Sequence, residues 1–357
     1  MLRRISLLFA LTPWLALATE ATPSGPSITV YNWNDYIAPQ VLENFERDSG
    51  IHVDYHTYAT AEELLQRLDA GDAIDVAVPS HDALPKLIRE KRLQPLDFAR
   101  LPNRSHLDKP LLNKLAAFDP QNRYAVPYLW GSVGLAINQP KAEAAYGGPL
   151  PNSWSLLFDP VQSARLAGCG MSVIDAPDEV LSILLNYTGY SLARSSTTRL
   201  RAAGETLNAL RPRLKYVDSE RYIDDLANGR LCVSLAWVGD ALAAAKAGQP
   251  VRFLIPEEGS ALFIDNLVIP ASAPHADLAH RFIDYLMQPQ VAALISEETL
   301  YPSPNADAQG FIDPALRDLP GLYPDRDTKR RLFALDPLPD GHASVRDEVW
   351  ARFRSGE

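Results

Sequence analysis

Several predicted strands of this chain are followed by an acidic residue, and aromatic residues precede most of these acids. The acids are Asp35, Glu179, Asp240 and Asp265, and the aromatics are Trp33, Trp237 and Phe263. An ammonium group that leaves water needs an anion and hydrogen-bond acceptors, and a methylene chain needs apolar walls. Aromatic faces provide such walls and attract a nearby cation by roughly 0.5 to 2 kcal/mol each. The pattern therefore predicts a site for an organic cation, with Tyr36 and Tyr301 as further aromatic candidates.

Each of these residues also has an ordinary structural interpretation. Asp35 and Asp240 could cap helix N-termini, where a carboxylate accepts from free backbone N–H groups. Glu179 could be a first-turn acid of a helix, and Asp265 could be a turn residue. An aromatic residue can simply pack in a core, and this is the interpretation we prefer for Trp130, Trp154 and Trp350. We favour a site because the acids and the aromatics occur together.

The elements that must position these residues alternate from the start of the mature chain. Strands are predicted at 27–33, 51–58 and 73–80, and helices at 38–50 and 60–71, the second with a capping box at its start. This order predicts an open, largely parallel sheet. Such sheets bind ligands at the carboxyl ends of their strands, where Trp33 to Tyr36 and Ser80 lie.

The alternation of strands and helices begins anew after a segment that contains Pro127 and Gly131. From there to about Glu258 the chain has the pattern of a second α/β unit. The predicted strand 261–270 and the predicted helix 276–289 could belong to either unit by pattern alone. The chain is too long for one compact core and suits two.

Residues 1–18 have the pattern of a cleaved secretory signal peptide. Two arginines come first, an apolar run covers 5–15, and small residues form a cleavage signal that ends at Ala18. Cleavage after Ala21 fits as well. An uncleaved membrane anchor is the alternative, but the apolar run is short for a bilayer. Because no Cys follows the run to receive a lipid, we expect a soluble, exported chain.

The composition indicates which partners the chain can have and where it works. Lys and Arg number 34 against 44 Asp and Glu, a net charge of −10, and no basic cluster is visible. We therefore expect no nucleic-acid partner. The two cysteines, Cys169 and Cys232, form an isolated pair, which in an exported protein predicts a disulfide. Its loop would add on the order of 4 kcal/mol of stability. Two free thiols are the alternative.

Motifs along the whole mature chain resemble those of one family. They are "YNWNDYIAP", "DVAVPS", "VPYLWGSVGLAINQ", "CGMSVIDAPDEV", "YIDDLANGRLCVSLAWVGDA", "FIDNLVIPASA" and "GLYP". On these motifs the chain is identified as a member of the spermidine/putrescine-binding family of periplasmic proteins. The resemblance implies an α/β, type II periplasmic binding protein fold. In this fold two lobes with mixed, largely parallel sheets are joined by crossover strands, with a ligand cleft between them. The resemblance also supports the bridge between Cys169 and Cys232.

The resemblance further implies lobe boundaries and a function. Lobe 1 would comprise 27–130 and 259–298, and lobe 2 would comprise 131–258 and 299–357. A protein of this family captures a polyamine in the periplasm by cleft closure and delivers it to the membrane permease of an ABC importer. We therefore expect a monomer that has no cofactor, no metal and no catalytic residue. Signalling by the loaded protein to a membrane sensor is a further use of the same binding event.

Family roles fall on particular residues of this sequence. The aromatic clamp falls on Trp33, Tyr36, Trp237, Phe263 and Tyr301, the amine-binding acids on Asp35, Glu179, Asp240 and Asp265, and a hydroxyl contact on Ser80. Asn34 departs from the family, which usually has a small hydroxyl there. Asp82 and Ala83 also depart, since a small polar residue and an aromatic are expected at these positions.

These positions bear on the choice of ligand. Phe263 favours putrescine, because the resemblance associates Phe with diamine binders and the larger Trp with spermidine binders. Asp82 and Ala83 favour a longer polyamine, because they add an acid and room. We predict putrescine, with spermidine, cadaverine and agmatine as alternatives.

Two other classes of function fit parts of the pattern. Paired acids could serve as general acid and base in a glycosidase. Against this, nothing in the sequence places one carboxylate in apolar surroundings that would raise its pKa. A ferric-ion or other metal carrier on the same fold would use tyrosines, histidines and acids. Of the histidines, only His52 and His56 have the spacing of ligands, and we predict that they face solvent.

Overall fold

The computed structural model describes residues 25–335, 338 and 341–356, so the predicted signal peptide, residues 1–18, lies outside the described residues.

The first elements are β1 (Ser27–Trp33), α1 (Pro39–Ser49), β2 (His52–Tyr58), α2 (Ala61–Ala70), β3 (Val76–Ala77), the 3-10 turn η1 (His81–Ala83), α3 (Leu84–Arg89) and α4 (Lys109–Leu115). The next are β4 (Ala125–Asn138), α5 (Gln139–Tyr146), α6 (Ser155–Phe158), α7 (Pro160–Leu166), β5 (Met171–Val173), α8 (Pro177–Tyr187) and α9 (Thr197–Leu210). They continue with β6 (Tyr216–Val217), α10 (Arg221–Ala227), β7 (Val233–Trp237), α11 (Val238–Lys246), β8 (Val251–Leu254) and β9 (Ser260–Val268). The last are α12 (Ala276–Leu286), α13 (Pro289–Thr299), α14 (Pro314–Arg317), α15 (Arg326–Arg331), β10 (Leu332–Ala334) and α16 (Ala343–Ser355).

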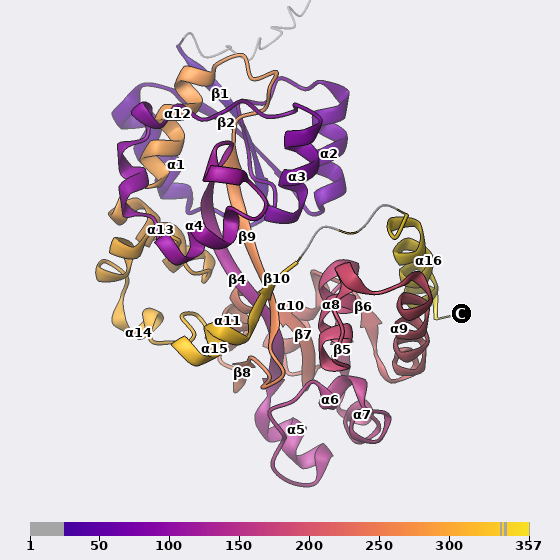
Figure 1. Cartoon of the computed structure of the whole chain (residues 1–357). Helices are drawn as coiled ribbons and strands as arrows, with labels where there is room; N and C mark the ends of the chain where they lie inside the picture. Colours follow the sequence, from indigo (N-terminus) through magenta and orange to yellow (C-terminus); the bar gives the residue numbers. More distant parts are fainter. Residues whose placement is uncertain (1–24, 336–337, 339–340, 357) are drawn as a thin grey trace, which may run out of the picture.

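The strands form one mixed sheet in the order β2-β1-β3-β9-β4-β7-β5-β6, with β10 beside β9 and β8 beside β4. β1 pairs in parallel with β2 and β3, and β5 pairs in parallel with β6 and β7. β4 and β9 are antiparallel, and Figure 1 shows both running between an upper and a lower group of elements. The α/β class with a mixed, largely parallel sheet is therefore as predicted.

Elements near the end of the chain return to both groups. α12 contacts β1 and α13 contacts α1, whereas α16 packs against α8 and α9. The C-terminal part of the chain thus contributes to both ends of the sheet, as the predicted lobes require. The residue boundaries given above for the two lobes remain a prediction.

The amphipathic pattern and caps of α2 form as the sequence predicts. The hydroxyl of Thr60 accepts from the backbone N–H of Glu63 at 3.3 Å, and the Glu63 carboxylate accepts from the N–H of Ala59 at 2.8 Å. Leu64 and Leu68 are buried. Signals within its own sequence therefore predict where this helix begins and which face it buries.

The third predicted strand, 73–80, is much shorter in the structure. Only Val76–Ala77 form β3. Pro79, which has no N–H to add to a ladder, lies just beyond its C-terminal end. The Pro79 carbonyl instead accepts from the backbone N–H of Asn266 at 3.0 Å. Ser80 then lies opposite Asp265 in an isolated antiparallel bridge. The end of the regular strand thus sets the position of Ser80.

The two long strands, β4 and β9, lie side by side in the middle of the sheet. β4 pairs with β9 over 125–132 and with β7 and β8 over 133–138. Every residue of β4 and β9 is buried. A polar side chain in either strand must therefore find its partners inside the protein. Asp265 and Asn266 of β9 are two such residues.

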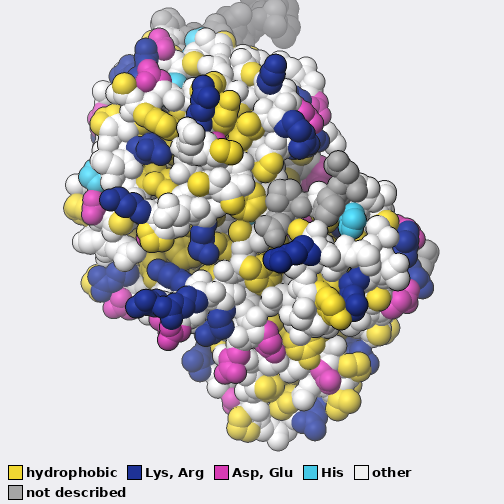
Figure 2. All heavy atoms as spheres, viewed as in Figure 1, with side chains coloured by type: hydrophobic (Ala, Val, Ile, Leu, Met, Phe, Trp, Pro, Cys, Tyr) yellow, Lys and Arg dark blue, Asp and Glu magenta, His cyan; other side chains and the backbone are white. Residues whose placement is uncertain are grey.

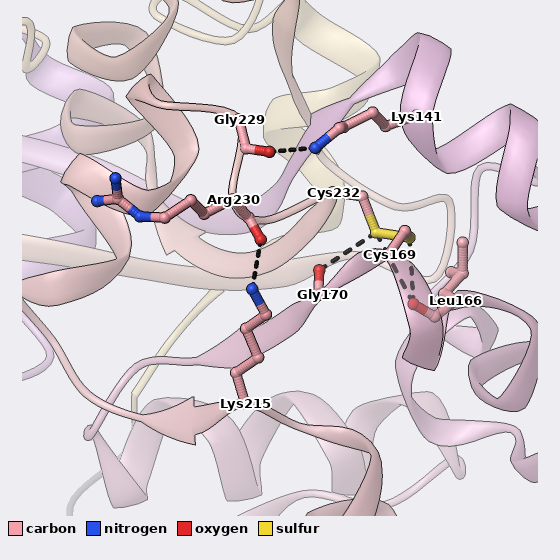
Figure 3. Close-up of a disulfide and its surroundings, with 8 residues drawn as sticks. All are labelled: Lys141, Leu166, Cys169, Gly170, Lys215, Gly229, Arg230 and Cys232. Carbon is pink, nitrogen blue, oxygen red and sulfur yellow. Dashed lines mark hydrogen bonds between the residues drawn. A yellow bond between two sulfur atoms is a disulfide. The ribbon is translucent and has the colours of Figure 1, made fainter.

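Cys169 and Cys232 form the predicted disulfide, with Cα atoms 5.6 Å apart. Cys169 ends the short turn before β5, and Cys232 directly precedes β7, as Figure 3 shows. The three tryptophans assigned to packing are buried as predicted; they are Trp130, Trp154 and Trp350.

The surface carries both signs of charge despite the net charge of −10. In Figure 2, Lys and Arg side chains gather over α14 and α15, and the last turn of α15 carries Lys329, Arg330 and Arg331. The statement that the sequence has no basic cluster is therefore wrong for this helix. Among the described helices, none combines the length and the apolar character that crossing a lipid bilayer requires.

Candidate functional site

Asp265 lies inside β9 and is only 4% exposed. The hydroxyl of Tyr36 donates to its Oδ2 at 2.7 Å, and the hydroxyl of Ser80 donates to its Oδ1. The interpretation of Asp265 as a turn residue is therefore wrong. No Lys or Arg in the described part of the chain pairs with this carboxylate, so its charge is met by neutral hydroxyl groups.

Burial raises the pKa of Asp265 to about 6, and the charge of Asp82 acts in the same direction. The hydrogen bonds from Ser80 and Tyr36 lower the pKa and oppose these effects. Above pH 6 the carboxylate is therefore mostly ionised, although it is buried. A buried anion of this kind favours a cation that enters from outside.

Asp240 lies in the first turn of α11 and has a similar environment. The hydroxyl of Tyr222 donates to its Oδ2, and the hydroxyl of Tyr301 donates to its Oδ1 at 3.0 Å. Burial raises the pKa of Asp240 to about 6, helped by the charge of Asp35 and opposed by the two hydroxyl bonds. The N-cap of α11 is Trp237, so Asp240 does not cap the helix.

The ring of Tyr301 joins these two carboxylates through aromatic contacts. Its centroid lies 5.2 Å from the ring of Tyr36 and 5.8 Å from the ring of Phe263, both edge-on. The network thus unites six predicted residues from five separate segments: Tyr36, Ser80, Asp240, Phe263, Asp265 and Tyr301.

Two glycines leave the space that these rings occupy. A Cβ on Gly239 would lie 2.3 Å from the Tyr301 ring, and a Cβ on Gly131 would lie 2.5 Å from the Phe263 ring. Any other residue at either position would displace an aromatic ring from the site.

Glu179 lies in the first turn of α8, as one of its structural interpretations predicts. Burial raises its pKa to about 8, and the charges of Asp178, Asp82 and Asp265 add to the effect. Asp82 of η1 also has a raised pKa because it is buried, with its own and the Ala83 backbone N–H groups and Arg346 acting in the opposite direction. Acids from η1, α8 and β9 therefore act on one another.

These raised pKa values correct one argument drawn from the sequence. The sequence showed no carboxylate in surroundings that would raise its pKa, whereas the structure raises the pKa of Asp240, Asp265 and Glu179. Burial is the largest cause in each case. It depends on contacts between distant segments, which a local pattern does not reveal.

The remaining predicted residues lie close to the ends of their strands. Trp33 is half-buried at the end of β1, with its ring 4.6 Å from that of Tyr58 and its indole nitrogen buried without a partner among the described residues. Asn34 and Asp35 are exposed in the turn that follows, and Asp35 has a φ of 52°. The N-cap of α1 is Ala38, so Asp35 is not a cap either. Trp237 is half-buried at the end of β7. The binding roles of these four residues remain predictions.

Sequence reasoning missed two tyrosines that support the network. Tyr222 of α10 is fully buried and holds Asp240, and Tyr128 of β4 donates to the backbone carbonyl of Tyr36 at 2.6 Å. Both lie in motifs quoted above, but inside elements, where an aromatic residue indicates only packing. Their hydroxyl partners come from other segments, so no local signal identifies them.

Each histidine of the predicted pair in β2 lies beside a carboxylate. His52 pairs with Glu46 at 2.7 Å and His56 with Asp54 at 3.0 Å, and both rings are exposed as predicted. No group of three or more His, Cys, Asp or Glu that could hold a metal occurs in the described part of the chain.

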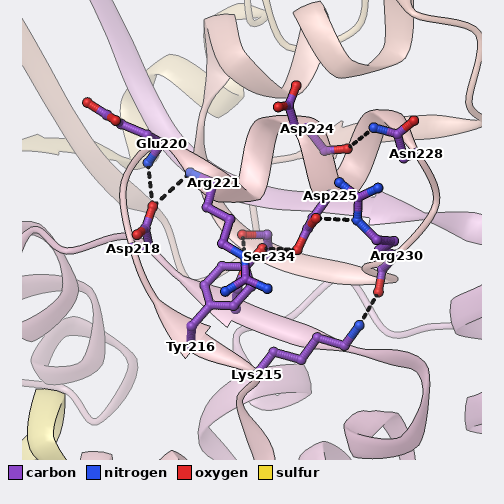
Figure 4. Close-up of polar contacts among 11 residues, drawn as sticks. Lys215, Tyr216, Asp218, Glu220, Arg221, Asp224, Asp225, Asn228, Arg230 and Ser234 are labelled. Atoms are coloured by element: carbon purple, nitrogen blue, oxygen red, sulfur yellow. Dashed lines mark hydrogen bonds and ion pairs between the residues drawn. The ribbon is translucent and has the colours of Figure 1, made fainter.

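Asp225 of α10 provides a contrast, shown in Figure 4. The hydroxyl of Tyr216 donates to its Oδ2 at 2.7 Å, Arg230 pairs with its Oδ1, and Arg221 lies 3.6 Å from its Oδ2. Burial raises the pKa of Asp225, but the bonds from Tyr216 and Arg230 and the two arginine charges outweigh it. The pKa therefore stays below its usual value.

Comparisons with known proteins show which family the chain belongs to. The family model of bacterial extracellular solute-binding proteins matches residues 40–321. The putrescine-binding periplasmic protein SpuD of Pseudomonas aeruginosa is 38% identical over 336 residues, which cover 92% of this chain and 92% of that protein. The putrescine-binding periplasmic protein PotF of Escherichia coli is 38% identical over 343 residues, which cover 93% of this chain and 92% of that protein.

A solved structure confirms the fold. The spermidine/putrescine ABC transporter substrate-binding protein PotD of Streptococcus pneumoniae matches with a TM-score of 0.80 at 26% identity. The match covers 93% of this chain and 99% of the solved one. The predicted periplasmic binding protein fold is therefore correct over nearly the whole described chain.

Proposed function

Because this chain belongs to the family of bacterial extracellular solute-binding proteins, we propose that it captures a polyamine in the periplasm. It delivers the polyamine to the membrane permease of an ABC importer. The signal peptide predicted at residues 1–18 directs export, and the mature protein acts as a monomer. It binds its ligand without catalysis and without a cofactor.

The single observation that carries the proposal is the pair of carboxylates Asp240 and Asp265. Each is held by two neutral hydroxyl groups and by no Lys or Arg of the described residues. Hydroxyl bonds keep the carboxylates available as anions but leave the charge uncompensated. A ligand with two ammonium groups would compensate both.

Putrescine is the ligand we propose. Phe263 in the aromatic network supports a diamine, as the family resemblance implies, and the two relatives named above are putrescine-binding proteins. An amino acid such as lysine would bring a carboxylate into a site rich in them and would be repelled. The alternative is a protein of the same fold for spermidine or another polyamine, with a sensing role.

Further residues complete the proposed site around this pair. Trp33 and Trp237 provide apolar walls for the methylene chain, Asp35 and Glu179 share the ammonium groups with the central carboxylates, and Asn34 accepts through its amide oxygen. Trp33 is half-buried and its indole N–H has no partner among the described residues, which supports a contact with the ligand.

Binding should draw the two predicted lobes together. The first predicted lobe contains Ser80 and Tyr36, and the second contains Asp240 and Glu179. A ligand that contacts both lobes stabilises the closed state. Solution scattering should show a smaller radius of gyration at saturating putrescine. An unchanged radius would contradict closure.

A thermal-shift panel tests the function. A ligand at 100 times its dissociation constant adds about 2.7 kcal/mol of stability, so putrescine should raise the melting temperature while lysine should not. Competition calorimetry then ranks spermidine, cadaverine and agmatine. Spermidine that binds at least about tenfold tighter than putrescine would overturn the choice of ligand, and no response to any polyamine would overturn the function.

A further inference from the structure

One arginine of the C-terminal helix reaches the acids of the site. Nη1 of Arg346 in α16 donates to Oδ2 of Asp178 at 2.8 Å, and Nη2 lies 2.8 Å from Oδ1 of Asp347. The Arg346 side chain is only 20% exposed. Asp178 directly precedes Glu179 in the first turn of α8. A protein cation therefore lies beside the acid that precedes Glu179, one of the acids that the proposed site offers to ligand ammonium groups.

Other contacts of α16 hold this arginine in place. The indole nitrogen of Trp350 donates to Oδ1 of Asp175 at 2.6 Å, and Nε of Arg354 lies 3.2 Å from Oδ2 of the same residue. Asp175 lies in the loop between β5 and α8. Helix α16 thus contacts the loop that leads to Glu179, and these contacts place the guanidinium of Arg346 beside Asp178.

The charge of Arg346 lowers the pKa of only some of the neighbouring acids. It opposes the rise that burial causes in the pKa of Asp178 and of Asp82. The pKa of Glu179 is instead raised further by Asp178 and Asp82. Oδ1 of Asp178 is buried and has no hydrogen-bond partner among the described residues. Removal of Arg346 would therefore leave the whole Asp178 carboxylate uncompensated.

We propose that Arg346 is a built-in counter-cation that takes the place of a ligand's third ammonium group at Asp178, and thereby restricts the site to diamines. The inference rests on the proposed function, since it concerns which polyamine fits the same site.

A purely structural role for Arg346 predicts a different result. If the arginine only anchored α16, its loss would lower stability and would weaken all polyamines to the same degree. If it is a counter-cation, its loss creates a demand for positive charge that a triamine satisfies and a diamine does not. The ratio of spermidine affinity to putrescine affinity therefore separates the two roles.

The test measures this ratio by calorimetry on the full mature chain. Arg346→Met keeps the apolar stem and removes the charge, and it should raise the ratio at least about tenfold. Arg354→Met is the matched control, because Arg354 also joins α16 to this loop through an acid. It should leave the ratio within about threefold of the parent. A ratio that is unchanged in Arg346→Met overturns the inference.

Two further variants complete the test. In Asp178→Asn with Arg346→Met, acid and cation are both removed, so the gain for spermidine should largely disappear. Asp178→Asn alone should shift the ratio the other way, toward putrescine, and it decides the matter if Arg346→Met does not fold. A shift toward spermidine in Asp178→Asn would contradict the inference. If the parent protein binds neither polyamine, both the proposed function and this inference are wrong. If the parent protein binds polyamines but the ratio is unchanged in Arg346→Met, only this inference is wrong.

Discussion

Asp225 and Asp240 lie in neighbouring helices, and their carboxylates have different kinds of partner. Each accepts a hydrogen bond from a tyrosine hydroxyl, from Tyr216 and Tyr222 respectively. Two arginines also reach Asp225 and hold its pKa below the usual value. Asp240 receives only hydroxyl groups, and burial raises its pKa to about 6. The chain thus supplies cations to Asp225 and none among its described residues to Asp240, the acid of the proposed site.

Asp240→Asn breaks this comparison most directly. It removes the charge that the ligand must meet, and we expect a loss of about 2 to 5 kcal/mol of putrescine binding by calorimetry. Asp225→Asn is the matched control, and it should lower the melting temperature while leaving the affinity nearly unchanged. Equal losses of affinity in the two variants would show that the two acids do not differ in role.

Tyr222→Phe sharpens the comparison, because it removes one hydroxyl donor and leaves the carboxylate of Asp240. A hydrogen bond to a charged group contributes about 1.5 to 3 kcal/mol, so binding should weaken by about that amount. The pKa of Asp240, followed by NMR, should rise further. Tyr216→Phe removes the corresponding donor of Asp225 and should leave ligand binding unaffected; a matching loss there would point to a general effect on folding.

The pH dependence follows from the raised pKa values. The ligand binds ionised carboxylates, and Glu179 has a pKa of about 8. Affinity should therefore fall by up to about tenfold per pH unit, or 1.4 kcal/mol, as the pH is lowered from 8 to 6. Calorimetry across this range measures the slope. Glu179→Gln should flatten it, and a slope that persists in this variant would assign the titration to another group.

The stability of the ligand-free protein should have the opposite dependence on pH. Glu179, Asp240 and Asp265 bind protons more tightly in this fold than in the unfolded chain. Their contribution to stability is thus fully present below the pKa of unfolded carboxyls, about 4, and is lost as the pH rises through about 6 to 8. Melting temperatures without ligand, measured over that range, check the sign.

Aromatic substitutions should have the smallest effect. Trp33→Leu or Phe263→Leu keeps part of the apolar contact and loses the aromatic face, which costs on the order of 1 kcal/mol of binding. Calorimetry on these two variants beside Asp240→Asn gives the ranking. If the aromatic variants lose more affinity than the acidic one, the ligand is not a diamine.

Local patterns in the sequence predicted much of the fold and the centre of the site. β1 has its predicted bounds, the capped helix α2 follows its apolar pattern, and the disulfide joins the isolated cysteines. Asp240 and Asp265 could be selected because an acid next to a buried strand is unusual there. Most of these signals lie within a few residues of one another, and the two cysteines could be paired because the sequence contains no others. They can therefore be recognised without knowledge of the fold.

Other features depend on contacts between distant segments, and the sequence does not show them. Tyr222 and Arg346 are separated from their partners by helices and strands, and neither occupies an unusual position in its own helix. The short β3 ends just before Pro79, whose carbonyl accepts from the backbone N–H of Asn266 in β9. The raised pKa of Glu179 arises from burial, which is a property of the assembled chain.

The disulfide also bears on the alignment of two strands. β5 and β7 are parallel neighbours with Met171 opposite Val233, and each strand starts within two residues of a linked cysteine. A slip by one residue would turn every side chain of the strand to the other face of the sheet. The link at the strand starts excludes such a slip, while the strand ends lead to Glu179 and Asp240. We therefore expect reduction of the bond to loosen the spacing between these two acids as well as to lower stability.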